Sequence, residues 1–347
     1  MKHVFTVHSP ITFFISFCIF KHLGISEDDA IIIASNYSVP IKFGRTVDSY
    51  EGLNTGVFVK FMKHNLPNSY DRYISDITNG HNFIAYVDLM HAYQRVLVTH
   101  ENCETFHFME EGTASYVLPD NLLELAHMTK KQTGFRVKGV KDLLFSLRRI
   151  MRGHTVSLLS LPYHPQSYKY FPNIKYFTFS RDGYPGVSSD KRVVLTPSLS
   201  DDELSALTYI TNMDDSTIWV EEAYPRDYNV SEDLYVKAIK KTYTLLNENQ
   251  KERLFIKLRP KQNKEQSVLY RTLKEMDADF RVIPDEAVAE AIFVNSKNLT
   301  VIALTSSLLF YAEVFGHTAY SFYDILEGKP QTMYDSLPSF WGKVEKL

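Results

Sequence analysis

Two adjacent carboxylates, Glu110 and Glu111, follow an apolar run at residues 104–109 and precede Gly112. The run is typical of a buried parallel strand, so both carboxylates are expected at its carboxyl end, where open α/β sheets bind ligands. Neighbouring carboxylates repel each other, which raises the pKa of one and suits it to accept a proton. Gly112 permits a tight turn and a close approach of substrate. The structural alternative is an acidic helix N-terminus.

A basic segment in the second half also follows a predicted strand. Lys257, Arg259 and Pro260 lie at the end of an apolar run at residues 253–258. The guanidinium of Arg259 offers a fork of donors that matches a phosphate group. An ordinary surface position for an arginine before a proline is the alternative.

Two serines further along the chain predict a second anion-binding position. Ser306 and Ser307 follow an apolar strand and open a helix, so their hydroxyl and N–H groups would point at an anion. Such serines are also common helix caps. Glu290 follows Pro284 by six residues and is placed to accept hydrogen bonds from ribose hydroxyls.

The elements that position these residues can be predicted from the apolar pattern. The chain is expected to open with a strand at 3–8, a helix at 11–23 and a strand at 30–34. Pro10 suits the start of this helix and Gly24 its end, and the βαβ order implies a parallel sheet. The loop after the first strand, His8 to Thr12, should face the same side of the sheet as the paired carboxylates. Ser9 and Thr12 are therefore candidate substrate contacts.

The second half repeats the alternation of strands and helices. Strands are predicted at 216–220, 253–258, 280–283 and 299–303, and helices at 231–247, 264–276, 284–292 and 306–315. A Pro- and Gly-rich stretch at about 160–190 is expected to link two domains, residues 1–185 and 186–347. The predicted fold class is α/β with two doubly wound, Rossmann-like domains facing a cleft. Nucleotide-sugar glycosyltransferases of the GT-B class have this architecture.

Composition excludes several other classes. The net charge of −3 gives no nucleic-acid signal, and the chain has only two cysteines, which argues against a disulfide framework or zinc site and for a cytoplasmic protein. No phosphate loop or nucleophile elbow is present. Asp277 and Asp279 match a D-x-D metal pattern but are expected in an ordinary turn, so no metal site is predicted.

Residues 130–152 are strongly basic and carry apolar residues at helical spacing. Such a helix either lies on an anionic membrane surface or is an ordinary surface helix with one packed face. Peripheral contact with the inner membrane is expected through this segment.

Glu110-Glu111-Gly112, Pro284 with Glu290, and Ser306-Ser307 together resemble the motifs of bacterial sialyltransferases. That group includes lipooligosaccharide sialyltransferases and capsular polysialyltransferases, which carry D/E-D/E-G, K-x-H-P and Ser-Ser motifs. Here the middle motif departs, because Arg259 stands where the family has histidine.

The resemblance implies an inverting, metal-independent transferase that moves sialic acid from CMP-sialic acid to a galactoside or sialoside of a surface glycan. It implies that the acidic motif supplies the base, with Glu110 preferred over Glu111 although the sequence does not separate them. It also implies donor binding by Lys257, Arg259 and Pro260, by Glu290 at the ribose, and by the serine pair at the phosphate. No cofactor is expected. Three alternatives stay open: a CMP-Kdo-dependent transferase, a CDP-glycerol-dependent one, and a non-catalytic glycan-binding relative.

Overall fold

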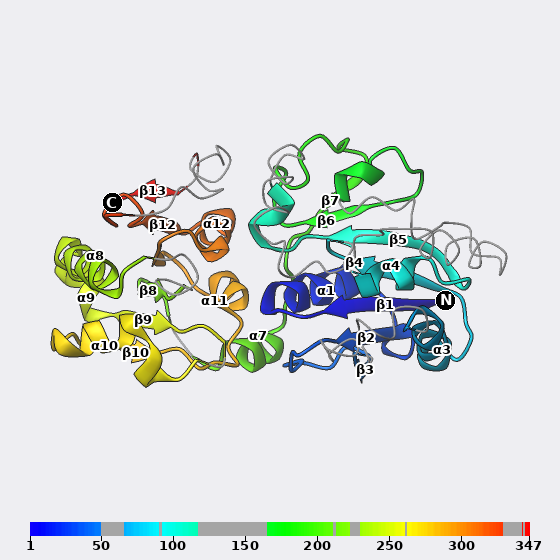
Figure 1. Cartoon of the computed structure of the whole chain (residues 1–347), viewed down its shortest axis with the longest axis horizontal. Coiled ribbons are helices and arrows are strands. Elements are labelled where there is room, and N and C mark those ends of the chain that lie inside the picture. Colours follow the sequence, from blue (N-terminus) through cyan, green and yellow to red (C-terminus); the bar gives the residue numbers. More distant parts are fainter. Residues whose placement is uncertain are drawn as a thin grey trace. The chain divides into compact units, whose positions relative to one another are not determined.

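The computed structural model forms two compact units, Met1–Ser198 and Leu199–Leu347, each built on a parallel β-sheet (Figure 1). It describes residues 1–49, 66–89, 92–116, 165–210, 213–222, 230–260, 262–328, 342 and 344–347. The boundary lies later than the expected division between residues 185 and 186. The reason is that strand β7 (Arg192–Val194) pairs with β6 (Tyr176–Thr178) and so completes the first sheet.

The first sheet has seven strands in the order β3-β2-β1-β4-β5-β6-β7 within the described residues. Its remaining strands are β1 (Lys2–Val7), β2 (Ala30–Ala34), β3 (Arg45–Asp48), β4 (Phe83–Val87) and β5 (Cys103–Met109). All described pairings in it are parallel, as the opening βαβ pattern predicts.

Helices cover both faces of this sheet. Helix α1 (Pro10–His22) packs on one face, where Phe13 and Phe5 both contact Phe43. Val4 points to the opposite face, whose core includes residues of α3 (Leu66–Thr78) and α4 (Ala92–Val98). This alternation along β1 is the ordinary geometry of a strand. Residues 11–19 of α1 are all buried, so the apolar run is an internal helix.

The sequence pattern does not predict β3, α3, α4 or β6. The stretch expected as a linker at 160–190 contains a short 3-10 helix, η4 (Pro165–Tyr168), and strand β6. Strand β6 is only three residues long and lies among turn-forming residues, which hide its signal. Its pairing with β5 nevertheless places Thr178 and Phe179 beside the paired carboxylates.

The second unit has a six-stranded parallel sheet in the order β10-β9-β8-β11-β12-β13 within the described residues. These strands are β8 (Thr217–Val220), β9 (Leu254–Lys257), β10 (Arg281–Val282), β11 (Thr300–Ala303), β12 (Thr318–Ser321) and β13 (Glu345–Lys346). The four predicted strands of this half are confirmed within a residue or two at each end.

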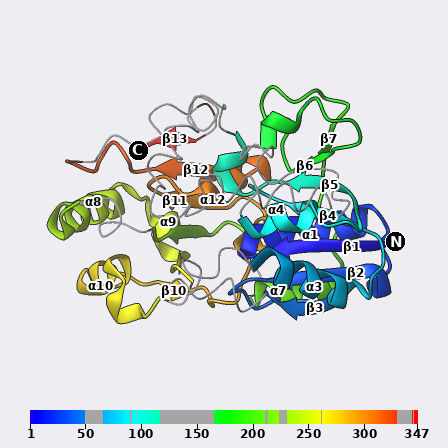
Figure 2. The same ribbon diagram turned by 45° about the vertical axis from the view of Figure 1, so that its right-hand side comes forward.

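Helices α8 (Glu232–Leu245) and α10 (Val268–Glu275) pack on one face, where Ile239 and Leu269 share a core with Trp219 and Phe322. Helix α11 (Ala289–Asn295) contacts both α7 (Asp201–Thr208) and α12 (Ser307–Val314). Short α9 (Glu248–Glu252) precedes β9. Figure 2 shows the same elements from a second direction.

Among the described residues, no helix combines the length and the apolar character that a membrane crossing requires. The sequence also predicts a helix at 119–128, after the turn at Gly112. This stretch and the basic segment 130–152 both lie outside the described residues.

Candidate active site

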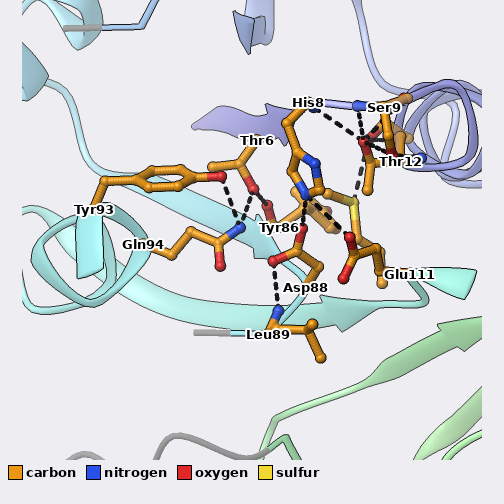
Figure 3. Close-up of polar contacts among 12 residues, drawn as sticks. Thr6, His8, Ser9, Thr12, Tyr86, Asp88, Leu89, Tyr93, Gln94 and Glu111 are labelled. Carbon is orange, nitrogen blue, oxygen red and sulfur yellow. Dashed lines mark hydrogen bonds and ion pairs between the residues drawn. The ribbon is translucent and has the colours of Figure 1, made fainter. Parts of the chain in front are cut away.

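The strand order of the first sheet reverses between β1 and β4, which makes their carboxyl ends a topological switch point. Ligands of open α/β sheets bind at such a point. His8 directly follows β1, Asp88 directly follows β4, and Glu111 follows the adjacent β5. Three ionisable side chains therefore meet at the position where this fold class binds its substrates (Figure 3).

The ring of His8 is held against Asp88, whose side chain is fully buried. Nε2 of His8 forms a short hydrogen bond with Oδ2 of Asp88, and the backbone N–H of Leu89 donates to Oδ1. Burial lowers the pKa of His8, but its bond to Asp88 and the charges of Asp88 and Glu111 outweigh this and raise the pKa to about 9. His8 is therefore a cation at neutral pH.

Glu111 turns its carboxylate toward the same ring. Its Oε1 lies 3.8 Å from Nε2 of His8, and a quarter of its side chain is exposed. Its own N–H donates to Oγ of Ser115 over 2.8 Å. Burial raises the pKa of Glu111 to about 8, with a contribution from the charge of Asp88 and opposition from His8. A carboxylate in these surroundings accepts a proton more readily than an exposed one.

Glu110 lies in different surroundings from its neighbour. It is fully buried, and its Oε2 accepts hydrogen bonds from the hydroxyls of Tyr116 and Thr178 and from the backbone N–H of Phe179 at 3.2 Å. These partners belong to η3 (Gly112–Tyr116) and to the end of β6. The side chain of Glu110 thus ties β5 to the segments around it.

The other residues predicted on this side have local structural contacts. Ser9 caps α1 in a capping box with Thr12, whose hydroxyl also accepts from the backbone N–H of His8 at 3.0 Å. Thr12 is completely buried, so its hydroxyl serves the helix start. Gly112 has φ of +54°, a left-handed conformation that favours glycine.

His8, Asp88 and Glu111 also form a group that could hold a metal ion, with ligand atoms within 4.8 Å of one another. The direct contact between His8 and Asp88 already pairs two of these atoms. Asp277 and Asp279 are exposed in the turn after α10, with Asp277 at a φ of +50°.

The second sheet has its own switch point between β8 and β11. Glu222, two residues beyond β8, places its Oε1 2.7 Å from the N–H of Thr305 and 2.6 Å from that of Ser306. The predicted anion position at the start of α12 is therefore occupied by a carboxylate of the chain itself. Burial raises the pKa of Glu222 to about 7, although these donors act in the opposite direction. Ser306 is the N-cap of α12, and Ser307 is its first residue.

Lys257 is buried and holds the loop that follows β10. Its Nζ donates to the carbonyl of Pro284 at 2.7 Å and to that of Asp285 at 3.1 Å. Burial lowers the pKa of Lys257, while the charges of Asp285 and Glu290 oppose this effect. Glu290 is buried in the first turn of α11. The structure thus brings Lys257 and Glu290 together across neighbouring strand ends.

Arg259 is partly exposed in the turn after β9, and Pro260 beside it is exposed. The backbone N–H of Arg259 donates to Oε1 of Gln262 at 3.2 Å. Burial raises the pKa of Glu221, while its hydrogen bonds at the start of α10 and, after them, the charge of Arg259 act in the opposite direction. Strand β8 lies between β9 and β11, so the segments carrying Arg259, Glu221 and Ser306 follow neighbouring strands.

Sequence reasoning missed Asp88, Glu221 and Glu222, and named His8 only as part of a loop. One signal could have found all four, because each is a polar residue within two positions of the end of a buried parallel strand. Glu221 and Glu222 even repeat the paired-carboxylate pattern of Glu110 and Glu111.

The chain is similar in fold to solved glycosyltransferases. The glycotransferase of kitacinnamycin matches with a TM-score of 0.52 and 10% identity, covering 100% of this chain and 86% of the other. Spinosyn forosaminyltransferase SpnP matches with a TM-score of 0.48 and 11% identity, over 100% of this chain and 85% of the other. The fold class is GT-B, as predicted. No curated protein sequence matches the chain.

A family model described as alpha-2,8-polysialyltransferase matches residues 62–322, three quarters of the chain. The matched range contains Asp88, both carboxylates after β5, Glu222 and the serine pair at the start of α12, whereas His8 precedes it. This match extends across both units and agrees with the glycosyltransferase fold. The chain therefore belongs to the alpha-2,8-polysialyltransferase family.

Proposed function

We propose that this protein is an inverting glycosyltransferase that moves sialic acid from CMP-sialic acid to a hydroxyl of a bacterial surface glycan. The family match supports sialyl transfer, and the GT-B fold supports a nucleotide-sugar donor. The observation that carries the proposal is the partly exposed Glu111 at the switch point of the first sheet. It supplies a proton acceptor where the fold binds substrates.

Glu111 acts as the general base in this proposal. The acceptor hydroxyl attacks the anomeric carbon, its proton passes to the carboxylate of Glu111, and the bond to the CMP phosphate breaks. CMP leaves with the bonding electron pair as an anion. A carboxylate whose pKa is raised to about 8 is close to the working pH, which favours general-base catalysis. Glu110 is less suited, because its carboxylate is enclosed by three donors.

The second unit binds the donor in this proposal. The start of α12 offers two backbone N–H groups to the phosphate, and Arg259 offers a permanent positive charge nearby. Donors aimed at the leaving phosphate stabilise the charge that develops as the bond breaks. Glu222 must lose its charge or leave these N–H groups when the phosphate binds. Glu290 is the proposed ribose contact.

The proposed acceptor is a terminal sialoside, because the family description names α2,8-linked sialic acid polymers. A terminal galactoside is the second acceptor to test. The test is incubation of the purified protein with CMP-sialic acid and each acceptor, with CMP release and product mass as the readouts. Sialylated product, formed equally with and without a metal chelator, is the expected result.

Parallel incubations with CMP-Kdo and CDP-glycerol test the donor. Product from either one alone, without product from CMP-sialic acid, would reassign the donor. Binding of CMP-sialic acid without release of CMP at any pH would contradict catalysis and favour a glycan-binding role.

A further inference from the structure

We propose that His8 and Asp88 are positioning residues for the base, with Asp88 holding the His8 ring, and His8 placing a positive charge beside the carboxylate of Glu111 and orienting it for the acceptor. This inference rests on the proposed role of Glu111. It adds two residues that the acidic motif does not contain, one of them outside the range that the family model matches. The three side chains come from three consecutive positions in the sheet, after β1, β4 and β5.

The geometry fixes the histidine from both sides. Its backbone N–H donates to the hydroxyl of Thr12, which is buried at the start of α1, and its Nε2 bonds to the fully buried Asp88. Asp88 is itself fixed by the N–H of Leu89. Figure 3 shows the carboxylates of Asp88 and Glu111 turned toward the same edge of the ring. A ring held this way has little freedom to turn away from Glu111.

The charges explain why a cation is needed there. Two carboxylates, Asp88 and Glu111, lie on one ring, and burial, followed by repulsion from Asp88, favours the protonated form of Glu111. A protonated Glu111 cannot accept the proton of the acceptor. Imidazolium at His8 offsets this repulsion, because an opposite charge within about 4–6 Å favours the ionised carboxylate. Tyr93 and Tyr184 also face this group, but burial raises the pKa of both well above the ordinary value, so they stay neutral.

The first test is the pH dependence of kcat/KM for the wild type and for His8→Gln. The glutamine keeps a polar side chain but removes the cation. We expect the acid limb of the profile to move upward by at least one pH unit, which is a tenfold loss of rate at any pH below the limb. Activity should recover at higher pH, with the KM for the donor unchanged. His8→Lys should keep the limb near its wild-type position, because lysine restores the charge.

The matched control is His3→Gln on the same strand. His3 contacts the hydroxyl of Tyr86 at 3.0 Å, and burial lowers its pKa, so it contributes no charge at neutral pH. This variant should leave the acid limb where it is. Equal loss of rate at every pH in His8→Gln would show a purely structural role for His8 and overturn the proposal.

The second test reads the histidine directly and does not depend on turnover. In protein labelled with ¹⁵N-histidine, both ring nitrogens of His8 should remain protonated up to about pH 8. Asp88→Asn and Glu111→Gln should each lower the pH at which the ring titrates, because each removes a neighbouring negative charge. A neutral ring at pH 7 in the wild type would contradict the proposal, even if His8→Gln does not fold.

The two tests separate this inference from the proposed function. Absence of CMP release in the wild type and in every variant, with His8 titrating as expected, would refute the transferase activity. It would leave the contacts among His8, Asp88 and Glu111 in place. Normal turnover of His8→Gln with an unshifted acid limb would refute the positioning role of His8 but not the transferase activity. A change in the His8 signals on addition of Mn²⁺ would assign the three side chains to a metal ion and overturn the positioning role.

Discussion

At the scale of single residues, neighbouring carboxylates after β5 differ because consecutive residues of an extended segment point to opposite sides. Glu111→Gln is expected to lower kcat by about 100- to 10,000-fold, the usual loss when a general base is removed. The KM for the donor should change little, since the side chain acts on the acceptor hydroxyl. The measurement is steady-state CMP release with the sialoside acceptor.

Glu110→Gln is the matched variant in this comparison. It leaves a side chain of the same size, and the loss of charge weakens the hydrogen bonds from Tyr116 and Thr178. We expect a lower melting temperature and a kcat well above that of Glu111→Gln. The reverse order of activities, with Glu110→Gln the inactive variant, would move the base to Glu110.

The sequence located the paired carboxylates but left their roles open. The two roles differ because Thr178 and Phe179 donate hydrogen bonds to Glu110. These residues lie almost seventy positions further along the chain, at the end of a three-residue strand. Asp88 was missed for a related reason. A single acidic residue after a strand has no local pattern, and only the order of the strands places it beside His8.

At the scale of elements, the sequence predicted the parallel strands that consist of continuous apolar runs, such as β2 and β11, and the helices with clear starts. It did not predict β3 or β7, which contain charged residues and lie at or near the edge of the sheet. A short edge strand is fixed by its partner in the sheet more than by its own residues. The three-residue β6 is likewise fixed by its partners, and its pairing with β7 extends the first unit past the expected boundary.

The start of α12 carries a prediction about donor binding. Glu222 accepts from the N–H groups of Thr305 and Ser306, and its pKa is raised to about 7. Ionised Glu222 repels the phosphate, whereas protonated Glu222 does not. CMP-sialic acid should therefore bind more weakly as the pH rises through 7. Its phosphodiester keeps the same charge over this range, so the change reports on the protein.

Glu222→Gln should remove this pH dependence and tighten donor binding at pH 8 by roughly tenfold, because a carboxyl group with a pKa of about 7 is protonated in only about one chain in ten at that pH. Calorimetric titration in a Glu111→Gln background avoids turnover during the measurement. If the affinity falls equally with pH in Glu111→Gln and in the double variant Glu111→Gln with Glu222→Gln, the carboxylate of Glu222 does not compete with the phosphate.

At the scale of the whole molecule, we predict that the chain binds anionic membrane surfaces through residues 130–152. This basic stretch lies outside the described residues, and the prediction rests on its composition alone. Cosedimentation with liposomes should require anionic lipid and should decrease as salt is added. Replacing Arg148, Arg149 and Arg152 with glutamine should reduce it, and equal binding to neutral liposomes would contradict an electrostatic contact.

The raised pKa of Glu111 also has a consequence for thermal stability. The folded chain holds this proton more tightly than the unfolded chain, so folding is favoured at low pH and loses that contribution as the pH rises from about 4.5 to about 8. Glu111→Gln cannot ionise, so it should melt with the wild type at pH 5 and above it at pH 9. The expected gain is a few degrees, because 1 kcal/mol moves Tm by roughly 2–4 °C in a domain of this size. A scan that shows the same difference at both pH values would refute this linkage. The ionised carboxylate that turnover needs is thus the form that the fold tolerates least, so selection for rate and selection for heat resistance act on this side chain in opposite directions.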